Sequence, residues 1–280
     1  MSRTRARNFV AAAIARHAAL VLTSGIMILP FVWMVSLSLK PPDEIFSSTW
    51  RVWPSTFYGV ENYRAALDAV PLLRYLLNGV LVCAAIFALQ ILVNLPCAYA
   101  LAKLRFRGRS TLFAAVLVGL LIPPQVLAIP LFVLFYAVGI LDTYAALVLP
   151  WTISVFGIFL MRQFFRTVPD ELIQAARLDG LSEFSIVWKI MLPVVWPALV
   201  AFGIFSVVAH WNDLFWPLVV IQSSHLATPP LGVLHFLNEE AGSSYGPLMA
   251  GTVLITLPLM LAFLFAQRRF VDGIVMTGMK

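Results

Sequence analysis

Charged residues are scarce in this chain. Asp, Glu, Lys and Arg make up only 11% of its 280 residues, whereas soluble domains carry roughly 25%. Hydrophobic residues account for 61% of the sequence, and the mean hydropathy is +0.92. A soluble fold is excluded, because such a chain lacks the polar residues that would face water. The composition therefore predicts a membrane protein.

Cysteine is nearly absent, and the motifs of common catalytic sites are missing. Cys83 and Cys97 lie fourteen residues apart in one apolar run, so they cannot close an ordinary disulfide and offer no metal-binding spacing. The sequence contains no Gly-x-x-x-x-Gly-Lys-Ser/Thr loop, no His-Glu-x-x-His and no Gly-x-Ser-x-Gly. We expect no catalytic residue, metal site or cofactor in this chain.

Apolar runs of about 20 residues, the length of a transmembrane helix, recur along the chain. They lie at 17–37, 77–101, 111–131, 144–161, 198–221 and 247–266. The stretch 130–141 is too short to cross again and is expected to form a helix at the outer interface. The sequence thus predicts an all-α membrane protein with six transmembrane helices. The expected parts are a cytoplasmic N-terminus (1–16), a first helix (17–37), an outer loop (38–76), a five-helix core (77–267) and a cytoplasmic tail (268–280).

Lys and Arg are distributed unevenly, and short loops rich in these residues stay in the cytoplasm. Fifteen of the nineteen lie before the first span, after the second, after the fourth or at the C-terminus. The other four, Lys40, Arg51, Arg64 and Arg74, precede the second span. Both termini and the loop 166–197 are therefore predicted to be cytoplasmic. The net charge of +6 is explained by this orientation and by anionic lipid head groups, without nucleic acid.

The segment 169–197 is polar and strongly patterned, and it predicts two short helices. Pro169 followed by two acidic residues is typical of a helix start. Gly180 stands where a left-handed residue ends the first helix, and Ser182 is suited to cap a second helix that Pro193 interrupts. The first helix carries an apolar stripe formed by Leu172, Ala175 and Ala176.

This segment resembles the cytoplasmic coupling loop of ABC-importer permease subunits, with a motif of Glu-Ala-Ala, three residues, Gly, a hydrophobic stretch and Leu-Pro. The matching residues are Ala175, Ala176, Asp179, Gly180, Ser182, Leu192, Pro193 and Pro197. Gln174 replaces the family's glutamate, which removes a charge but keeps hydrogen-bonding capacity. The resemblance implies that a separate ATPase contacts Glu171, Leu172, Gln174, Ala175, Ala176, Asp179 and Gly180. The alternative is an ordinary amphipathic connector between spans.

The resemblance extends over 37–280 to permeases of the carbohydrate-uptake type, which are binding-protein-dependent inner-membrane components similar to the small subunit of the maltose permease. It implies the type I ABC importer permease fold in a bacterial cytoplasmic membrane. The implied partners are a second permease subunit, an ATPase dimer that binds ATP and Mg, and an extracytoplasmic solute-binding protein. The implied solute is a sugar or sugar-like molecule, with glycerol 3-phosphate or a sugar-glycerol conjugate as alternatives.

Polar residues inside the apolar runs are costly unless they meet water or a partner. Trp211, Asn212 and Asp213 in the fifth span resemble a pattern of sugar permeases, which implies a position near the translocation path. The alternative is that they hold helices together. Pro123 and Pro124 break the third helix, which makes Gln125 a further candidate for the path, with a simple kink as the alternative.

Amide side chains also recur in the second span. Gln90 and Asn94 are four residues apart and share one helix face, and Asn78 lies within about 120° of Gln90 at 100° per residue. We expect this face to be buried against protein.

The C-terminal residues 267–280 resemble the family's ending, which reaches toward the ATPase. The implied contacts are Gly278 and Lys280, although Gly278-Met279-Lys280 departs from the common Gly-Ala-Val-Lys form. The alternative is a basic stub held by lipid head groups.

Two other functional classes compete with the importer permease. An ion-coupled secondary transporter would need internal inverted repeats and a membrane carboxylate; Asp213 is the obvious carboxylate, and no convincing repeat is seen. A membrane-embedded enzyme would need clustered catalytic groups near one interface. The coupling motif favours the importer permease.

Overall fold

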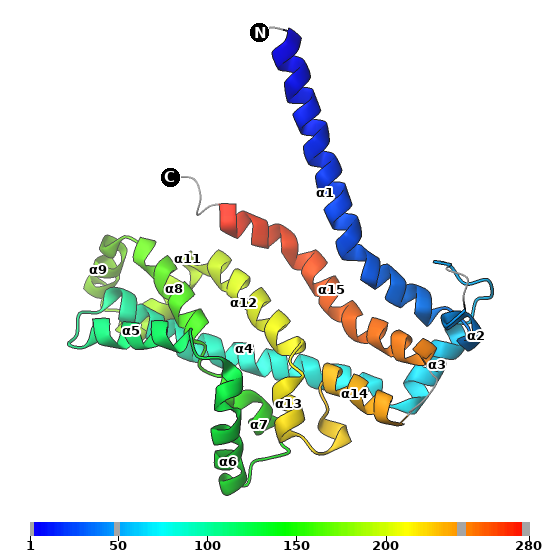
Figure 1. The fold of residues 1–280 in the computed structure, drawn as a ribbon. Coiled ribbons are helices and arrows are strands. Elements are labelled where there is room, and N and C mark those ends of the chain that lie inside the picture. Colours follow the sequence, from blue (N-terminus) through cyan, green and yellow to red (C-terminus); the bar gives the residue numbers. More distant parts are fainter. Residues whose placement is uncertain (1–2, 48–50, 240–244, 276–280) are drawn as a thin grey trace. The chain divides into compact units, whose positions relative to one another are not determined.

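The computed structural model describes residues 3–47, 51–239 and 245–275, which form helices and no strand (Figure 1). The elements of the first half are α1 (Arg3–Ser38), α2 (Pro42–Ile45), α3 (Gly59–Ala69), α4 (Leu72–Lys103), α5 (Arg109–Gly119), η1 (Pro124–Leu127), α6 (Ala128–Val138), α7 (Tyr144–Val148) and η2 (Leu149–Trp151). Those of the second half are α8 (Val155–Thr167), α9 (Asp170–Leu178), α10 (Glu183–Ile186), η3 (Val187–Met191), α11 (Leu192–Val194), α12 (Trp196–Trp211), α13 (Phe215–Val220), η4 (Ser224–Leu226), α14 (Pro229–Glu239) and α15 (Tyr245–Val275).

Three helices within these residues are long and apolar enough to cross a bilayer on their own. They are Ala12–Ser38 of α1, all of α4, and Tyr245–Phe265 of α15. Three bent pairs meet the same requirements: Arg109–Gly119 with Pro124–Val138, Tyr144–Trp151 with Val155–Thr167, and Glu183–Val194 with Trp196–Trp211, with bends of 97°, 42° and 85°. If each pair is one span, the described residues hold up to six spans, as the sequence predicts.

Three of the expected spans were wrong as continuous helices. The span 144–161 is interrupted between Trp151 and Val155, where the bend is 42°. In 111–131, α5 ends at Gly119 and Pro123 is extended, with φ −62° and ψ 131°. Consecutive prolines remove two N–H donors and disfavour helical backbone before them. In 198–221, α12 ends at Trp211 and α13 begins at Phe215. The break has a local cause, because a proline ring clashes with the carbonyl four residues earlier, and Pro217 stands four residues after Asp213.

The chain divides into two compact units, each described here by itself. The first contains 1–70 and 236–254, and the second contains 71–235 and 255–280. In the first unit, the buried Asn62 of α3 donates from Nδ2 to the carbonyls of Ser38 and Lys40, at 3.0 and 2.9 Å. A helix end leaves its last carbonyls unpaired, so this amide caps the end of α1.

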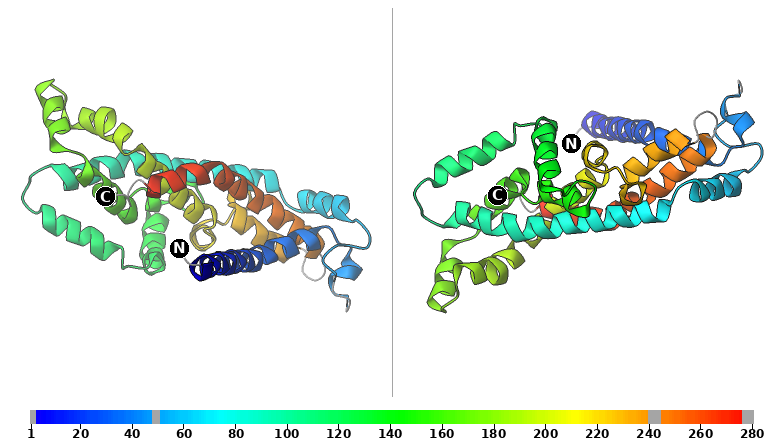
Figure 2. Two further views of the ribbon diagram at one scale, coloured as in Figure 1. Left: turned by 90° about the horizontal axis from the view of Figure 1, so that it is seen from above. Right: turned by 90° about the horizontal axis from the view of Figure 1, so that it is seen from below.

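The core of the second unit forms where α8 and α12 pack against α4, an unbroken helix that extends along this unit (Figure 2). Leu95, Tyr99, Met161, Phe165 and Phe202 are all buried there. Gly157 of α8 permits the close approach, since a Cβ at that position would lie 2.6 Å from the Phe202 ring. Packing of this kind, with small residues at the contact, is what associates helices inside a membrane.

The amides of α4 support irregular backbone in neighbouring segments. Asn78, Gln90 and Asn94 are all buried, as predicted. Nδ2 of Asn78 donates to the carbonyls of His225 and Ala227, Nε2 of Gln90 donates to the carbonyl of Trp151, and Oδ1 of Asn94 accepts from the backbone N–H of Ser154, at 3.0, 2.9, 2.8 and 3.2 Å. Each amide side chain therefore gives a hydrogen-bond partner to a backbone group in a segment where the regular helix is interrupted.

Candidate functional site

The predicted pair of short helices forms the end of the second unit where α4 terminates (Figure 1). Gly180 has φ +81°, the backbone N–H of Leu181 donates to the carbonyl of Ala176 at 3.0 Å, and that of Gly180 donates to the carbonyl of Arg177 at 3.0 Å. These two bonds define a Schellman motif, in which glycine occupies the left-handed position. Ser182 caps α10 by accepting from the N–H of Ser185. The expected interruption at Pro193 was misplaced, because the chain continues helically to Val194 and bends beside Val195.

Helix α9 presents a different apolar surface from the predicted stripe. Leu172 and Leu178 are 47% and 90% exposed, and Ala175 is exposed beside them. Ala176 is only 4% exposed and packs with Ile173 into the chain's own core, so grouping it with an outward stripe was wrong. Side chains three and four apart share a helix face, and the inward face is set by Ile173. The other residues expected to contact the ATPase, Glu171, Gln174, Asp179 and Gly180, are exposed.

Polar contacts tie α9 and α10 to the end of α4. Nζ of Lys103 donates to the carbonyl of Val168 at 2.6 Å and to the Asp170 carboxylate at 2.5 Å. The hydrogen bond from Lys103 holds the pKa of the Asp170 carboxyl below its ordinary value. Glu183 accepts from the Tyr99 hydroxyl at 2.5 Å.

Glu183 also accepts two hydrogen bonds from the Arg177 guanidinium, at 2.7 and 3.2 Å. This hydrogen bonding by Glu183 raises the pKa of Arg177 above its ordinary value. The Glu183 carboxylate of α10 thus accepts hydrogen bonds from Arg177 of α9 and from Tyr99 of α4. These bonds hold the angle between α9 and α10 at the Gly180 turn.

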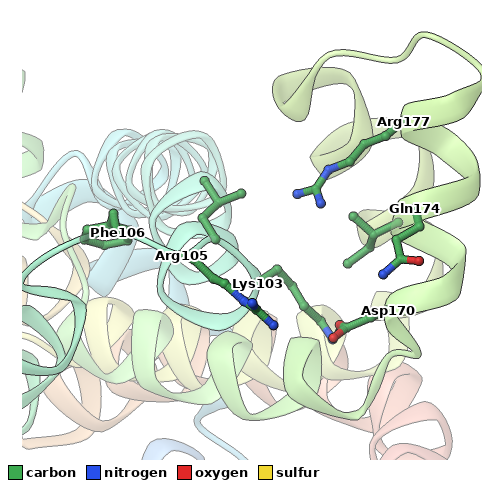
Figure 3. A pocket seen from close by; sticks show the side chains of 8 residues that line it. Lys103, Arg105, Phe106, Asp170, Gln174 and Arg177 are labelled. Atoms are coloured by element: carbon green, nitrogen blue, oxygen red, sulfur yellow. The ribbon is translucent and has the colours of Figure 1, made fainter.

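A basic groove separates α9 from the end of α4. It has a volume of about 630 Å³ and is lined by Lys103, Arg105, Phe106, Asp170, Gln174 and Arg177. Figure 3 shows the Lys103 ammonium meeting Asp170 at one end, while Gln174 and Arg177 project from α9. Lys103 is paired with Asp170 and Arg177 with Glu183, so Arg105 leaves the groove with a net positive charge.

Tyr99, Lys103 and Glu183 were not among the predicted site residues. Tyr99 and Lys103 are four residues apart on one face at the end of α4, so they share a surface that the helical period could have identified. Glu183 follows the cap residue Ser182 and is six residues from Arg177, a separation at which no regular helix pairs side chains. The tail residues Gly278 and Lys280 lie outside the described residues.

A second candidate site lies among the membrane segments of the second unit. Gln125 of η1 and Asp213 line a cavity of about 220 Å³ together with Trp151, His210, Phe215 and Trp216. The structure therefore brings together two of the four residues predicted for the translocation path. His210, Phe215 and Trp216 belong to the same polar and aromatic run of the sequence as Asp213, whereas Trp151 comes from a different expected span.

Trp211 and Asn212, the other two predicted path residues, lie outside this cavity. The indole of Trp211 is buried, and its Nε1 donates to the carbonyl of Ile255 on α15 at 3.2 Å. This contact between two helices is the kind that the alternative interpretation described. Asn212 is exposed and donates from Nδ2 to the carbonyl of Val208, one turn back on its own helix, at 2.8 Å.

The aromatic rings around the cavity are fixed by contacts behind them. Nε1 of Trp216 donates to the carbonyl of Ala146 at 2.8 Å, and its ring meets Phe135 edge-on at 6.0 Å between centroids. The Trp151 ring lies 5.2 Å from the His210 ring. The Asp213 carboxylate accepts from the backbone N–H of Trp216 at 3.2 Å. Aromatic faces beside polar groups are the lining that small-molecule sites use.

Known proteins with similar sequences are transport permeases. The permease AraQ of Halalkalibacterium halodurans, named for arabinooligosaccharide transport, is 34% identical over 91% of this chain and 92% of that protein. The lactose transport permease LacG of Rhizobium radiobacter is 34% identical over 94% of each. The sn-glycerol-3-phosphate permease UgpE of Yersinia pestis is 30% identical over 87% of this chain and 84% of its own length.

The fold is that of a solved ABC importer chain. A crystal structure of a bacterial ABC transporter involved in the import of the acidic polysaccharide alginate contains a chain with a TM-score of 0.81 and 22% identity, covering 96% of this chain and 99% of that one. Residues 94–275 match the family described as binding-protein-dependent transport system inner membrane component. This match contains α9, the Gly180 turn and the membrane cavity, and it covers more than half of the chain. The chain belongs to the family of binding-protein-dependent transport system inner membrane components.

Proposed function

We propose that this chain is a permease subunit of an ATP-driven importer for a sugar or sugar-like solute. The observation that carries the proposal is the family match over 94–275. The solute class is supported by the two relatives at 34% identity, which are named for arabinooligosaccharide and lactose transport. A relative at 30% identity is named for sn-glycerol 3-phosphate, so this compound is the second candidate.

The exposed face of α9, formed by Leu172, Ala175 and Leu178, is the surface that docks on a separate ATPase. Burying one exposed leucine side chain contributes roughly 1.5–3 kcal/mol. These apolar side chains project from a short helix that also carries Glu171 and Gln174. A small apolar surface with polar residues around it is suited to a protein partner.

Movement of α9 reaches the membrane segments through α4. Lys103 and Tyr99 join α4 to the two short helices, and Gln90 of the same helix bonds to Trp151 beside the cavity. A displacement of α9 by the ATPase is therefore passed along this continuous helix toward the irregular segments. Coupling of this kind needs a contiguous set of packed and hydrogen-bonded contacts, and α4 provides one.

The complete importer contains further proteins. A second permease subunit completes the path, two ATPase subunits bind ATP and Mg, and an extracytoplasmic binding protein delivers the solute. A solved relative of the fold is a bacterial alginate ABC transporter in complex with an alginate pentasaccharide-bound periplasmic protein. The chain crosses a bacterial cytoplasmic membrane with both termini inside, as its Lys and Arg distribution favours, and it binds no nucleotide itself.

The test is co-purification of the ATPase with the tagged permease. Ala175→Asp places a carboxylate on the exposed face of α9 without touching the chain's own core, and it should release most of the ATPase. The matched control is Ser110→Asp, which adds the same charge at an exposed position of α5 and should retain the partner. Raising the salt concentration should change binding little, because the contact is mainly apolar. Retention of the ATPase by Ala175→Asp would exclude α9 as the docking surface.

A further inference from the structure

We infer that residues 51–60, the aromatic segment, form a lipid-binding surface whose exposed rings insert into the head-group layer of the bilayer at the end of α1. The aromatic segment belongs to the connection between α1 and α4 and lies in the first unit. Its exposed large apolar side chains include Trp53, Phe57 and Val60, with exposed fractions of 68%, 63% and 66%. Contact with lipid does not depend on the transported solute, so it goes beyond the proposed function.

Hydrogen bonds hold the aromatic segment against the end of α1. The hydroxyl of Ser36 donates to the carbonyl of Val52, and the backbone N–H of Tyr58 donates to the carbonyl of Leu39 at 3.0 Å. Ser36 lies in the last turn of α1 and is buried. Two points of the aromatic segment are therefore fixed to the residues at which α1 ends.

Two further contacts fix the backbone around the exposed rings. Nζ of Lys40 donates to the carbonyl of Arg51 at 2.6 Å and lies 4.7 Å from the centroid of the Trp33 ring. The carboxylate of Glu44 accepts from the backbone N–H of Ser55 at 3.0 Å. Because the backbone is already ordered, little conformational freedom is lost when the rings enter lipid.

The end of α1 sets the depth of the aromatic segment in the membrane. The apolar span Ala12–Ser38 has 27 residues, which is about 40 Å of helix and close to the thickness of a bilayer with its head-group layers. The last residues of the span therefore lie among the head groups. Ser36 is about 3 Å along the helix axis from the end of the span, and Val52 is bonded to it. Trp53, the next residue, therefore lies at the level of the head groups.

The composition of the aromatic segment suits this layer. Tryptophan and tyrosine are enriched at membrane–water interfaces, because their rings are apolar while their N–H or O–H groups can bond to water and head groups. The aromatic segment contains Trp53, Phe57 and Tyr58, and Arg51 is its only charged residue. Binding therefore comes from the rings, and an anionic head group is not required.

A protein partner is the other kind of surface that exposed rings can meet. A soluble protein would reach these rings only if they projected beyond the head groups. The bonds to Ser36 and Leu39 instead keep the aromatic segment at the end of the helix. Lipid is therefore the partner that the position of the aromatic segment favours.

The experiment uses the whole importer in phosphatidylcholine vesicles, with one spin label on each variant. Cys83 and Cys97 are replaced by alanine, and Trp53→Cys carries the label in the aromatic segment. Met27→Cys, 74% exposed near the middle of the span, is the reference for lipid, and Glu61→Cys, exposed on α3, is the reference for water. Collision rates are measured with molecular oxygen, which concentrates in lipid, and with a water-soluble nickel complex. The ratio of oxygen to nickel collisions at Trp53→Cys should lie between those of the two references.

A second measurement keeps the natural cysteines. The tryptophan fluorescence that Trp53→Phe loses relative to the unmodified importer belongs to Trp53. Phosphatidylcholine brominated near the head group should quench this fluorescence, and phosphatidylcholine brominated at the chain ends should leave most of it. Equal parts of phosphatidylcholine and phosphatidylglycerol should give the same depth, because the rings and not charge bind the lipid.

Two results would overturn the lipid-binding surface. One is a ratio at Trp53→Cys equal to that at Glu61→Cys, with no quenching by either brominated lipid, which would place the ring in water. The other is protection of the label from both oxygen and nickel, which would show that a protein covers the aromatic segment. Neither result bears on the proposed function, which is tested by the binding of the ATPase to α9.

Discussion

Gly180 sets the angle between α9 and α10, and its replacement by valine should uncouple ATP hydrolysis from uptake. A Cβ at this position would have no atom within 4 Å, so valine meets no steric obstacle. The cost comes only from φ +81°, which an L-residue adopts at roughly 1–2 kcal/mol. That free energy lowers the population of the native turn by a factor of about 5–30.

The structure offers a matched control at the C-terminal end of α6. Gly139 has φ +75°, and a Cβ added there would likewise have no atom within 4 Å. Its turn has the same two backbone bonds, from Gly139 to Tyr136 and from Ile140 to Phe135. Gly139→Val therefore imposes the same strain away from the coupling segment. Gly180→Asn provides the opposite control, because asparagine tolerates the left-handed region.

The assay is solute-stimulated ATP hydrolysis by the reconstituted complex, with assembly measured on the same samples. We expect Gly180→Val to lose stimulation, and Gly139→Val and Gly180→Asn to keep most of it. Full stimulation in Gly180→Val with an intact complex would refute the coupling role of the turn. Equal losses in Gly180→Val and Gly139→Val would attribute the effect to general destabilisation.

Three further predictions concern the contacts around α9. Ala176→Asp should lower the melting temperature of the permease in detergent, since it buries an unpaired carboxylate at a cost of a few kcal/mol, whereas the same measurement on Ala175→Asp should show no change. The Lys103 contact lowers the pKa of Asp170, so the stabilisation from this ion pair is present above the ordinary carboxyl pKa near 4 and is lost as pH falls through the folded-state pKa. The difference in melting temperature between the unmodified protein and Asp170→Asn should therefore vanish in acid. A difference that stays constant with pH would contradict this. Tyr99→Phe and Glu183→Ala should be non-additive in a double-mutant cycle of uptake, because each of them removes the hydrogen bond between these two side chains.

The sequence predicted the local features best where a single residue determines them. The helix start at Pro169, the left-handed Gly180 and the Ser182 cap depend on intrinsic backbone preferences, and all three are found. The buried face of Gln90 and Asn94 followed from helical period alone. The predicted number of six spans also agrees with the up to six that the described residues hold, if each bent pair is one span.

Features that depend on tertiary contacts were predicted less well. Ala176 is apolar and lies next to Ala175, and only the packing of Ile173 into the core decides which of the two alanines faces outward. Arg177 and Glu183 meet because the Gly180 turn folds α10 back, which no spacing rule describes. The cavity collects side chains from three distant breaks, so hydropathy, which treats each span alone, could not assemble it.

The amides of α4 have a consequence for the order in which the protein forms during synthesis. Gln90 and Asn94 precede their partners Trp151 and Ser154 in the chain by about sixty residues, and Asn78 precedes its partners by about 150. A ribosome therefore completes α4 before it produces any segment whose backbone these amides satisfy. Each irregular segment enters the membrane with its hydrogen-bond partner already in place, so the most polar stretches of main chain need not wait unpaired in lipid. Moving α4 to the end of the chain by circular permutation would reverse this order and should reduce the yield of folded protein.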